Sequence, residues 1–201
     1  QGYTFNGWIL DGTNLGTDVT IKSGTIGNKN YTASWKINSY TVTYNYSENG
    51  GTNSSKTSDL VEYDKSIDLT PIAEKNGYTF VGWNTNANAK GGLSKLTMET
   101  SDVVLYAIYS KQVSVKFDKN GGQEDIVQNY TLFNKEVSLS INTPNTPTTR
   151  DGWTFLCYGI SKDDIEGVSK GEKITVNISE DKNELVYYTN WKKDIIVTFI
   201  D

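Results

Sequence analysis

Gly77-Tyr78-Thr79-Phe80-Val81-Gly82-Trp83 is the stretch that decides the fold, because two variants of it occur elsewhere in the chain. The earlier copy reads Gly2-Tyr3-Thr4-Phe5-Asn6-Gly7-Trp8, and the later one reads Gly152-Trp153-Thr154-Phe155-Leu156-Cys157-Tyr158. The copies begin at positions 2, 77 and 152, so they share one spacing of 75 residues. Self-similarity at a fixed period is the signature of a repeat architecture. The sequence therefore predicts tandem units of about 75 residues.

Other landmarks recur at matching places in each unit. An alternating pattern of apolar and polar residues, typical of a half-buried strand, opens each unit; it is found at Tyr40–Tyr44, Val113–Phe117 and Ile195–Phe199. Asn-Gly pairs, which favour hairpin turns, follow the first two of these at Asn49-Gly50 and Asn120-Gly121. A further strand pattern closes each unit, at Tyr31–Trp35, Leu105–Tyr109 and Tyr187–Trp191.

These landmarks divide the chain into four segments. We expect residues 1–36 to be the C-terminal half of a unit, residues 37–110 and 111–192 to be complete units, and residues 193–201 to be the opening strand of a further unit. The predicted linkers between units are short and polar and should leave little slack; they are Ser110-Lys111-Gln112 and Lys192-Lys193-Asp194. Because the chain opens within a motif, we expect any export signal and wall anchor to lie outside these residues.

The fold class expected from these patterns is α+β, dominated by strands. Tyr, Thr, Val, Ile, Gly and Asn are abundant, which favours strands and turns over helices. The one helical element we expect is a short turn at Pro71–Asn76, with the proline at its start and Gly77 as its stop.

The aromatic residues of the repeat are interpreted as core. Each small unit has to bury its own large side chains to be stable, and aromatic residues fall on fixed positions of the repeat. We expect the last aromatic of each motif to point inward and close the interior of its own sheet. The predicted structural anchors are Tyr3, Phe5, Trp8, Trp35, Tyr78, Phe80, Trp83, Tyr109, Trp153, Phe155, Tyr158 and Trp191.

The composition argues against catalysis and against several classes of partner. The sequence has no histidine, which removes the commonest general base and a common zinc ligand. Its single cysteine, Cys157, allows no intramolecular disulfide, and it is interpreted as a small buried residue. A net charge of −5 argues against a nucleic-acid partner. No apolar stretch is long enough to span a membrane. We therefore predict a protein that is not an enzyme and needs no cofactor or metal.

Two polar stretches were weighed as sites. Asp118-Lys119-Asn120-Gly121 is similar to the start of a calcium loop, but its glycine comes too early and the distant glutamate is missing, so a hairpin turn is the better interpretation. Asp163, Asp164 and Glu166 offer paired carboxylates of the kind a glycosidase uses, but they lie in a polar stretch that is interpreted as a solvated loop.

The motif at residues 77–83, with the Asn-Gly-Gly turn before it and Leu105-Tyr106-Ala107 after it, resembles the Listeria–Bacteroides repeat, also called the internalin B-repeat family. The resemblance covers nearly the whole chain, although the third copy departs from the motif at Trp153, Cys157 and Tyr158. It implies a β-grasp, ubiquitin-like fold for each unit. It also implies tandem repeats in secreted or wall-anchored proteins of the bacterial cell surface, with no catalytic residues.

Two functions remain open on the sequence alone. The first is a stalk or spacer that contacts only neighbouring repeats of its parent chain and holds another domain away from the cell surface. The second is an adhesion module that contacts a host protein or glycan. The second predicts an exposed patch specific to one unit, such as Tyr46 or the loop from Ile141 to Arg150.

Overall fold

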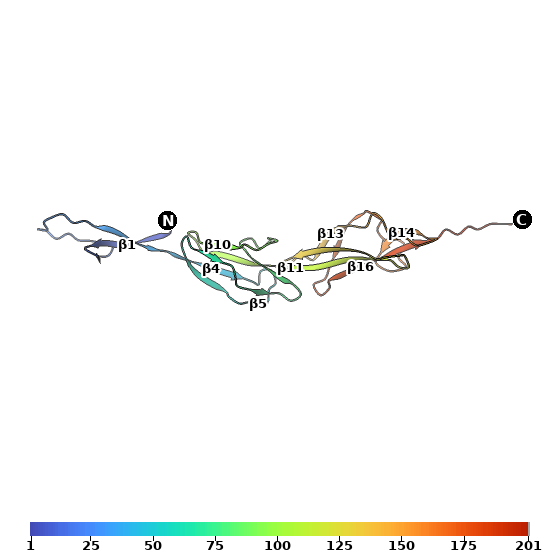
Figure 1. Cartoon of the computed structure of the whole chain (residues 1–201), viewed down its shortest axis with the longest axis horizontal. Coiled ribbons are helices and arrows are strands. Elements are labelled where there is room, and N and C mark those ends of the chain that lie inside the picture. Colours follow the sequence, from blue (N-terminus) through green and yellow to red (C-terminus); the bar gives the residue numbers. More distant parts are fainter. Residues whose placement is uncertain (201) are drawn as a thin grey trace. The chain divides into compact units, whose positions relative to one another are not determined.

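The computed structural model describes residues 1–200, and within that range the regular structure consists of strands alone. The chain divides into two compact units. The first comprises Gln1–Glu74 with Phe80–Ile108, and the second comprises Lys75–Thr79 with Tyr109–Asp201. Each unit is described separately below, and Figure 1 labels their strands.

Ten strands precede residue 100: β1 (Tyr3–Leu10), β2 (Thr13–Asn14), β3 (Thr32–Ile37), β4 (Ser39–Asn45), β5 (Asn53–Ser54), β6 (Ser58–Glu62), β7 (Ser66–Asp68), β8 (Ala73–Glu74), β9 (Thr79–Asn84) and β10 (Lys95–Thr97). Six follow: β11 (Val103–Asp118), β12 (Ile126–Phe133), β13 (Ser138–Asn142), β14 (Thr154–Gly159), β15 (Lys173–Asn177) and β16 (Glu184–Lys192).

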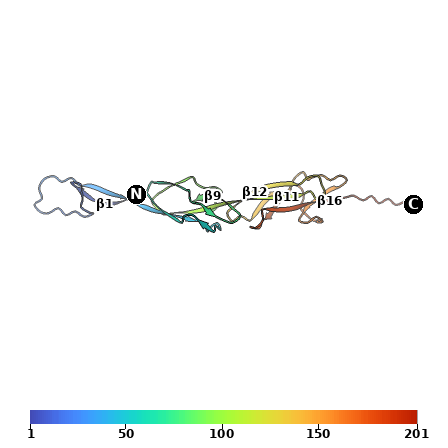
Figure 2. The ribbon, with the colours of Figure 1, turned by 60° about the horizontal axis from the view of Figure 1, so that its bottom comes forward.

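A mixed sheet forms the centre of the second unit. The second half of β11 pairs antiparallel with β12 and parallel with β16, and β16 pairs antiparallel with β14. Figure 2 shows β12 beside β11. The core lies against this sheet and gathers Val115, Phe117, Ile141, Tyr158 and Val176. A second small pair, β13 with β15, supplies two of these residues.

The first unit repeats the same arrangement. Its opening strand, β4, pairs antiparallel with β6 and parallel with the first half of β11, and β9 also pairs with β11. Small antiparallel pairs, β10 with β7 and β5 with β8, accompany the sheet. Residues 3–37 form a three-stranded antiparallel sheet in the order β2-β1-β3. In both repeats the opening and closing strands are therefore neighbours that run in the same direction.

The predicted helical turn at Pro71–Asn76 is wrong, and so is the α+β class. Ala73 and Glu74 form β8 instead, which pairs antiparallel with Asn53–Ser54. The six residues from Pro71 to Asn76 are too few to recover the cost of nucleating a helix, whereas pairing with β5 satisfies backbone groups of Ala73 and Glu74 directly. No helix in the described part of the chain is long and apolar enough to cross a membrane.

The predicted opening strand at residues 193–201 has no regular structure in its described part, residues 193–200. Its apolar side chains lie in solvent, and Phe199 is 91% exposed. Asp201 lies outside the described residues.

The glycines inside the motif permit an irregular strand. The pairing of β1 with β3 shifts register between Phe5 and Gly7, and that of β14 with β16 shifts between Phe155 and Cys157, at the equivalent place. Gly82 has φ +145°, and a Cβ built on it would lie 2.9 Å from the Cα of Gly92. The backbone conformation and the close approach of the next loop both require glycine here.

Replacing Gly82 with alanine is therefore expected to lower the free energy of unfolding by roughly 2–4 kcal/mol, because the methyl group meets backbone rather than a flexible side chain. Gly91→Ala is the matched control, since a Cβ at Gly91 would meet nothing within 4 Å. Its effect should stay within about 0.5 kcal/mol. Urea denaturation of both variants measures the difference, and equal midpoints would contradict the close-approach argument.

Candidate functional site

The last aromatic of the motif packs against the last aromatic residue of the opening strand. In the first unit, Trp83 meets Tyr44 edge-on, with ring centroids 4.9 Å apart. In the second, Tyr158 meets Phe117 in the same way at 4.8 Å. All four rings are buried. Because one ring comes from the opening strand and the other from the motif, each contact joins the two halves of a repeat.

The phenylalanine of the motif contacts the last aromatic of the motif in all three copies. Phe5 contacts Trp8 at 5.3 Å between centroids, Phe80 contacts Trp83 at 5.6 Å, and Phe155 contacts Tyr158 at 4.8 Å. Edge-to-face and tilted rings of this kind contribute about 0.5–1.5 kcal/mol beyond the area they bury. The motif is thus an aromatic pair carried on one bulged strand.

The two buried motif aromatics, Trp83 and Tyr158, differ in whether their polar atom makes a hydrogen bond. The Nε1 of Trp83 donates a hydrogen bond to the carbonyl oxygen of Pro71, at 2.7 Å. The hydroxyl of Tyr158 is buried without a hydrogen-bond partner, and so is that of Thr189, its neighbour across the strand pair. Burial raises the pKa of Tyr158 to about 12. Exchanging Trp for Tyr therefore keeps the packing and loses a hydrogen bond.

An asparagine fastens the loop after the motif to the closing strand. The side-chain nitrogen of Asn49 donates to the carbonyl oxygens of Ala87 and Ala107, both at 2.9 Å. Asn120 donates to the carbonyl of Lys162, which is four residues after Tyr158 just as Ala87 is four residues after Trp83. The sequence alone predicts these asparagines only as turn formers. The recurrence of an Asn at the Asn-Gly turn of each unit was the available signal.

The structure divides the twelve predicted anchors by exposure. The side chains of Trp83, Tyr109 and Tyr158 are fully buried. Those of Phe5, Tyr78, Phe80, Phe155 and Trp191 are half-buried. The remaining four are exposed: Tyr3, Trp8, Trp35 and Trp153. Three of these belong to residues 1–36, and the fourth, Trp153, is the first aromatic of its motif.

The acidic stretches form structural turns. Asp164 accepts hydrogen bonds from the backbone nitrogens of Ile160 and Glu166, which shapes its loop. Asp118 accepts from the backbone nitrogen of Asn120, and Lys116 lies 3.0 Å from Asp125 and 3.5 Å from Asp118. Among residues 1–200, no group of three His, Cys, Asp or Glu side chains is placed to hold a metal ion.

The loop from Ile141 to Arg150 is held in place by hydrogen bonds. The hydroxyl of Thr143 is buried and donates to the carbonyl of Ser169 at 2.6 Å. Thr148 is buried too, and its hydroxyl accepts from the backbone nitrogen of Glu124. Cys157 is buried, with its sulfur 3.4 Å from the carbonyl oxygen of Asp164. Tyr46 is half-buried.

Strand units joined in tandem, each closed by an aromatic pair between its opening strand and its motif, define the class as a β-rich repeat protein. Residues 40–108 match the model of the Listeria-Bacteroides repeat domain. Residues 40–108 therefore belong to this repeat family, which confirms the resemblance drawn from the motif at residues 77–83.

The chain is also similar to parts of longer proteins. Two come from Evansella cellulosilytica: one named "Putative Gly-rich membrane protein", 31% identical over 77% of this chain, and one named "Putative membrane protein", 30% identical over 78%. The matches span only 19% and 22% of those proteins. A third, the pre-mRNA-splicing factor CLF1 of Candida albicans, is 28% identical over 49% of the chain and 14% of its own length. No solved structure matches the chain.

Tyr158→Phe should leave stability at neutral pH unchanged or raise it by about 1 kcal/mol, because it removes a buried hydroxyl that has no partner. It should also flatten the loss of stability at alkaline pH. An unfolded tyrosine ionises near pH 10, but in the folded chain the pKa of Tyr158 is raised to about 12. Between these values the unfolded state binds fewer protons, so stability falls as pH rises, and phenylalanine removes this contribution.

Tyr44→Phe is the matched control, since the hydroxyl of Tyr44 donates to Asp59 at 2.9 Å. This variant should lose about 1 kcal/mol at neutral pH. Urea denaturation at pH 7 and at several points between pH 10 and 12 measures both effects. An equal loss of stability in the two variants at pH 7 would contradict the assignment of an unpaired hydroxyl at Tyr158.

Asn49→Asp should lower the free energy of unfolding by at least about 2 kcal/mol. The carboxylate would face two carbonyl oxygens in a buried site and could donate to neither of them. Asn88→Asp is the control, because Asn88 is exposed and lies next to Ala87 in the loop after the motif. Thermal unfolding of both variants tests the prediction. A stable Asn49→Asp protein would show that the two hydrogen bonds of Asn49 are dispensable.

Proposed function

We propose that this chain is a non-catalytic spacer segment of a bacterial cell-surface protein, made of β-grasp-type repeats that have lost the helix. The observation that carries the proposal is the continuity of β11. This single strand runs for 16 residues, from Val103 to Asp118, and includes the closing pattern of one repeat and the opening pattern of the next. A spacer needs such a connection, because a flexible linker would let its two ends approach each other.

The residues predicted as a linker, Ser110-Lys111-Gln112, lie inside this strand and pair with β12. Lys111 is buried, and its Nζ donates to the carbonyl oxygen of Glu180 at 2.5 Å. A buried lysine is rare unless its charge is satisfied, so this position is structurally constrained rather than a free hinge.

The β-grasp assignment is supported by the strand arrangement. In each repeat the opening strand pairs antiparallel with the second strand and parallel with the closing strand, which gives a mixed sheet with a parallel pair at its centre. The part of the chain between the second strand and the motif contains β7 and β8, which pair with β10 and β5 respectively.

The location on the cell surface is supported by the family and by the names of the relatives, two of which are called membrane proteins. We place the segment outside the cell, on a secreted or wall-anchored protein. The absence of histidine supports a non-catalytic role, as does the use of the Asp164 carboxylate in shaping its own loop. The alternative function is adhesion to a host protein or glycan. Against it, the loop from Ile141 to Arg150 is held by the hydrogen bonds of two buried threonines, Thr143 and Thr148.

Insertion of Gly-Ser-Gly-Ser between Ser110 and Lys111 tests the spacer role. It should interrupt β11 and shorten the mean distance between labels placed in the two units, because a Gly/Ser segment behaves as a flexible coil. The same insertion between Ser23 and Gly24, in an exposed loop, is the control. Paired-label distance measurements by electron spin resonance report the distribution. A broad distribution already present in the unmodified chain would overturn the proposal, and binding to a glycan or receptor panel would favour adhesion.

A further inference from the structure

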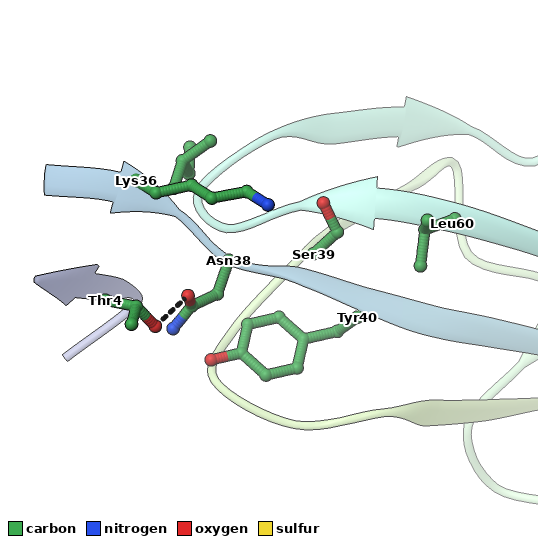
Figure 3. Close-up of a pocket in the computed structure, with 7 residues that line it drawn as sticks. Thr4, Lys36, Asn38, Ser39, Tyr40 and Leu60 are labelled. Carbon is green, nitrogen blue, oxygen red and sulfur yellow. Dashed lines mark hydrogen bonds between the residues drawn. The ribbon is translucent and has the colours of Figure 1, made fainter. Parts of the chain in front are cut away.

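The start of the motif has a different environment from its end. In the first unit, Tyr3 packs edge-on against Tyr63, with centroids 5.9 Å apart. The backbone nitrogen of Asn38 donates to the carbonyl of Gly2, and the carbonyl of Asn38 accepts from the nitrogen of Tyr63. The hydroxyl of Thr4 donates to the side-chain oxygen of Asn38 at 2.6 Å, as Figure 3 shows. The motif start therefore lies against the end of β6.

The second unit contains the same contact with different residues. It includes Lys75–Thr79, the start of the middle motif. The Nζ of Lys75 donates to the carbonyl oxygen of Asn134 at 2.5 Å and lies 3.7 Å from the centroid of the Tyr78 ring. The Nζ of Lys111 lies 5.6 Å from the same ring. Burial raises the pKa of Tyr78 and lowers that of Lys75. The start of the middle motif is thus linked through Lys75 to Asn134, the residue that follows β12.

Both contacts are made with the same feature of the repeat. Asp64 and Asn134 are the residues after the last aromatic of the second strand, Tyr63 and Phe133, and both have left-handed backbone, with φ of +61° and +55°. In each case the partner turn belongs to the repeat that follows the motif in sequence. In both examples the start of a motif therefore contacts the next repeat at this turn: Tyr3 packs on Tyr63, directly before Asp64, and Lys75 donates to Asn134.

The third motif start has the side chains for this contact. The guanidinium carbon of Arg150 lies 4.2 Å from the centroid of Trp153, and the Nζ of Lys193 lies 5.8 Å from it. These residues occupy the positions of Lys75, Tyr78 and Lys111 in the repeat. Trp153 nevertheless keeps 38% of its surface exposed. Phe199, which follows Lys193 in the sequence, occupies the position of Tyr44 and Phe117 in the repeat. Those two residues pack against Trp83 and Tyr158 in the cores.

We propose that Trp153, Arg150 and Lys193 form a docking surface for a further repeat unit of this type. That unit uses Ile195–Phe199 as its opening strand and presents the left-handed turn after its second strand to Trp153. One cation of the surface donates to a carbonyl of the turn, as Lys75 does to Asn134. The proposal goes beyond the spacer role, because the surface would join neighbouring units equally well in an adhesin.

An extended chain tests the docking surface. Residues 1–199 are followed directly by a second copy of residues 118–192, so that Phe199 takes the place of Phe117 and the opening strand leads into a complete unit. Hydrogen–deuterium exchange is followed at the added copy of the turn around Asn134, with and without Trp153→Ala. Loss of the aromatic contact should speed exchange there by about tenfold, the factor that corresponds to 1.4 kcal/mol, a typical value for a partly desolvated cation–π contact.

Two comparisons within the same experiment serve as controls. Exchange at the original Asn134 should be unchanged by Trp153→Ala and accelerated to a similar degree by Tyr78→Ala, since Tyr78 lies at that turn. Equal exchange at the added turn with and without Trp153, while Tyr78→Ala accelerates the original turn, would overturn the proposal. So would an added copy that stays unprotected throughout beside an intact Trp153.

Discussion

The structure depends on the parallel pairing of the first and last strands of a repeat, closed by one aromatic contact. Tyr44 with Trp83, and Phe117 with Tyr158, join the opening strand to the motif, and the closing strand lies between them in the sheet. Because the two strands are parallel, the chain runs in the same direction where it leaves a repeat as where it enters it. The closing strand can therefore continue as the next opening strand without a turn, as β11 does.

This dependence explains which substitutions between repeats are tolerated. Trp83 and Tyr158 fill the same place, since the contact requires a large ring and only secondarily a hydrogen bond. Gly82 becomes Cys157 because the third copy no longer adopts positive φ at that position. The asparagine of the Asn-Gly turn is kept, as Asn49 and Asn120. Its side-chain amide donates to backbone carbonyl oxygens of the loop after the motif, and this contact does not depend on the side chains of that loop.

The sequence predicts the strands, the turns and the burial of Trp83 and Tyr158 well, because period, alternation and Asn-Gly pairs are local signals. It fails at Pro71–Asn76, where pairing with Asn53–Ser54 is a long-range event that local propensity does not encode. It also treats every repeated aromatic as core. Repetition marks a shared environment, and a surface between successive repeats recurs as regularly as an interior does. Tyr3 and Trp153 occupy the same position of the motif, and both are exposed.

Cations lie beside the first aromatic of the second and third motifs, Tyr78 and Trp153, and suit a surface proposed to bind a further repeat. An apolar rim around an exposed ring would extend the hydrophobic patch and invite unspecific association. At Trp153 the guanidinium carbon of Arg150 lies 4.2 Å from the ring centroid, so the cation itself covers the ring. When a turn arrives, the same groups can donate to its carbonyl oxygens, as Lys75 does to Asn134. The arrangement at Arg150, Trp153 and Lys193 is therefore compatible with solvent and with a docked repeat, whereas the core pair around Trp83 is compatible only with burial.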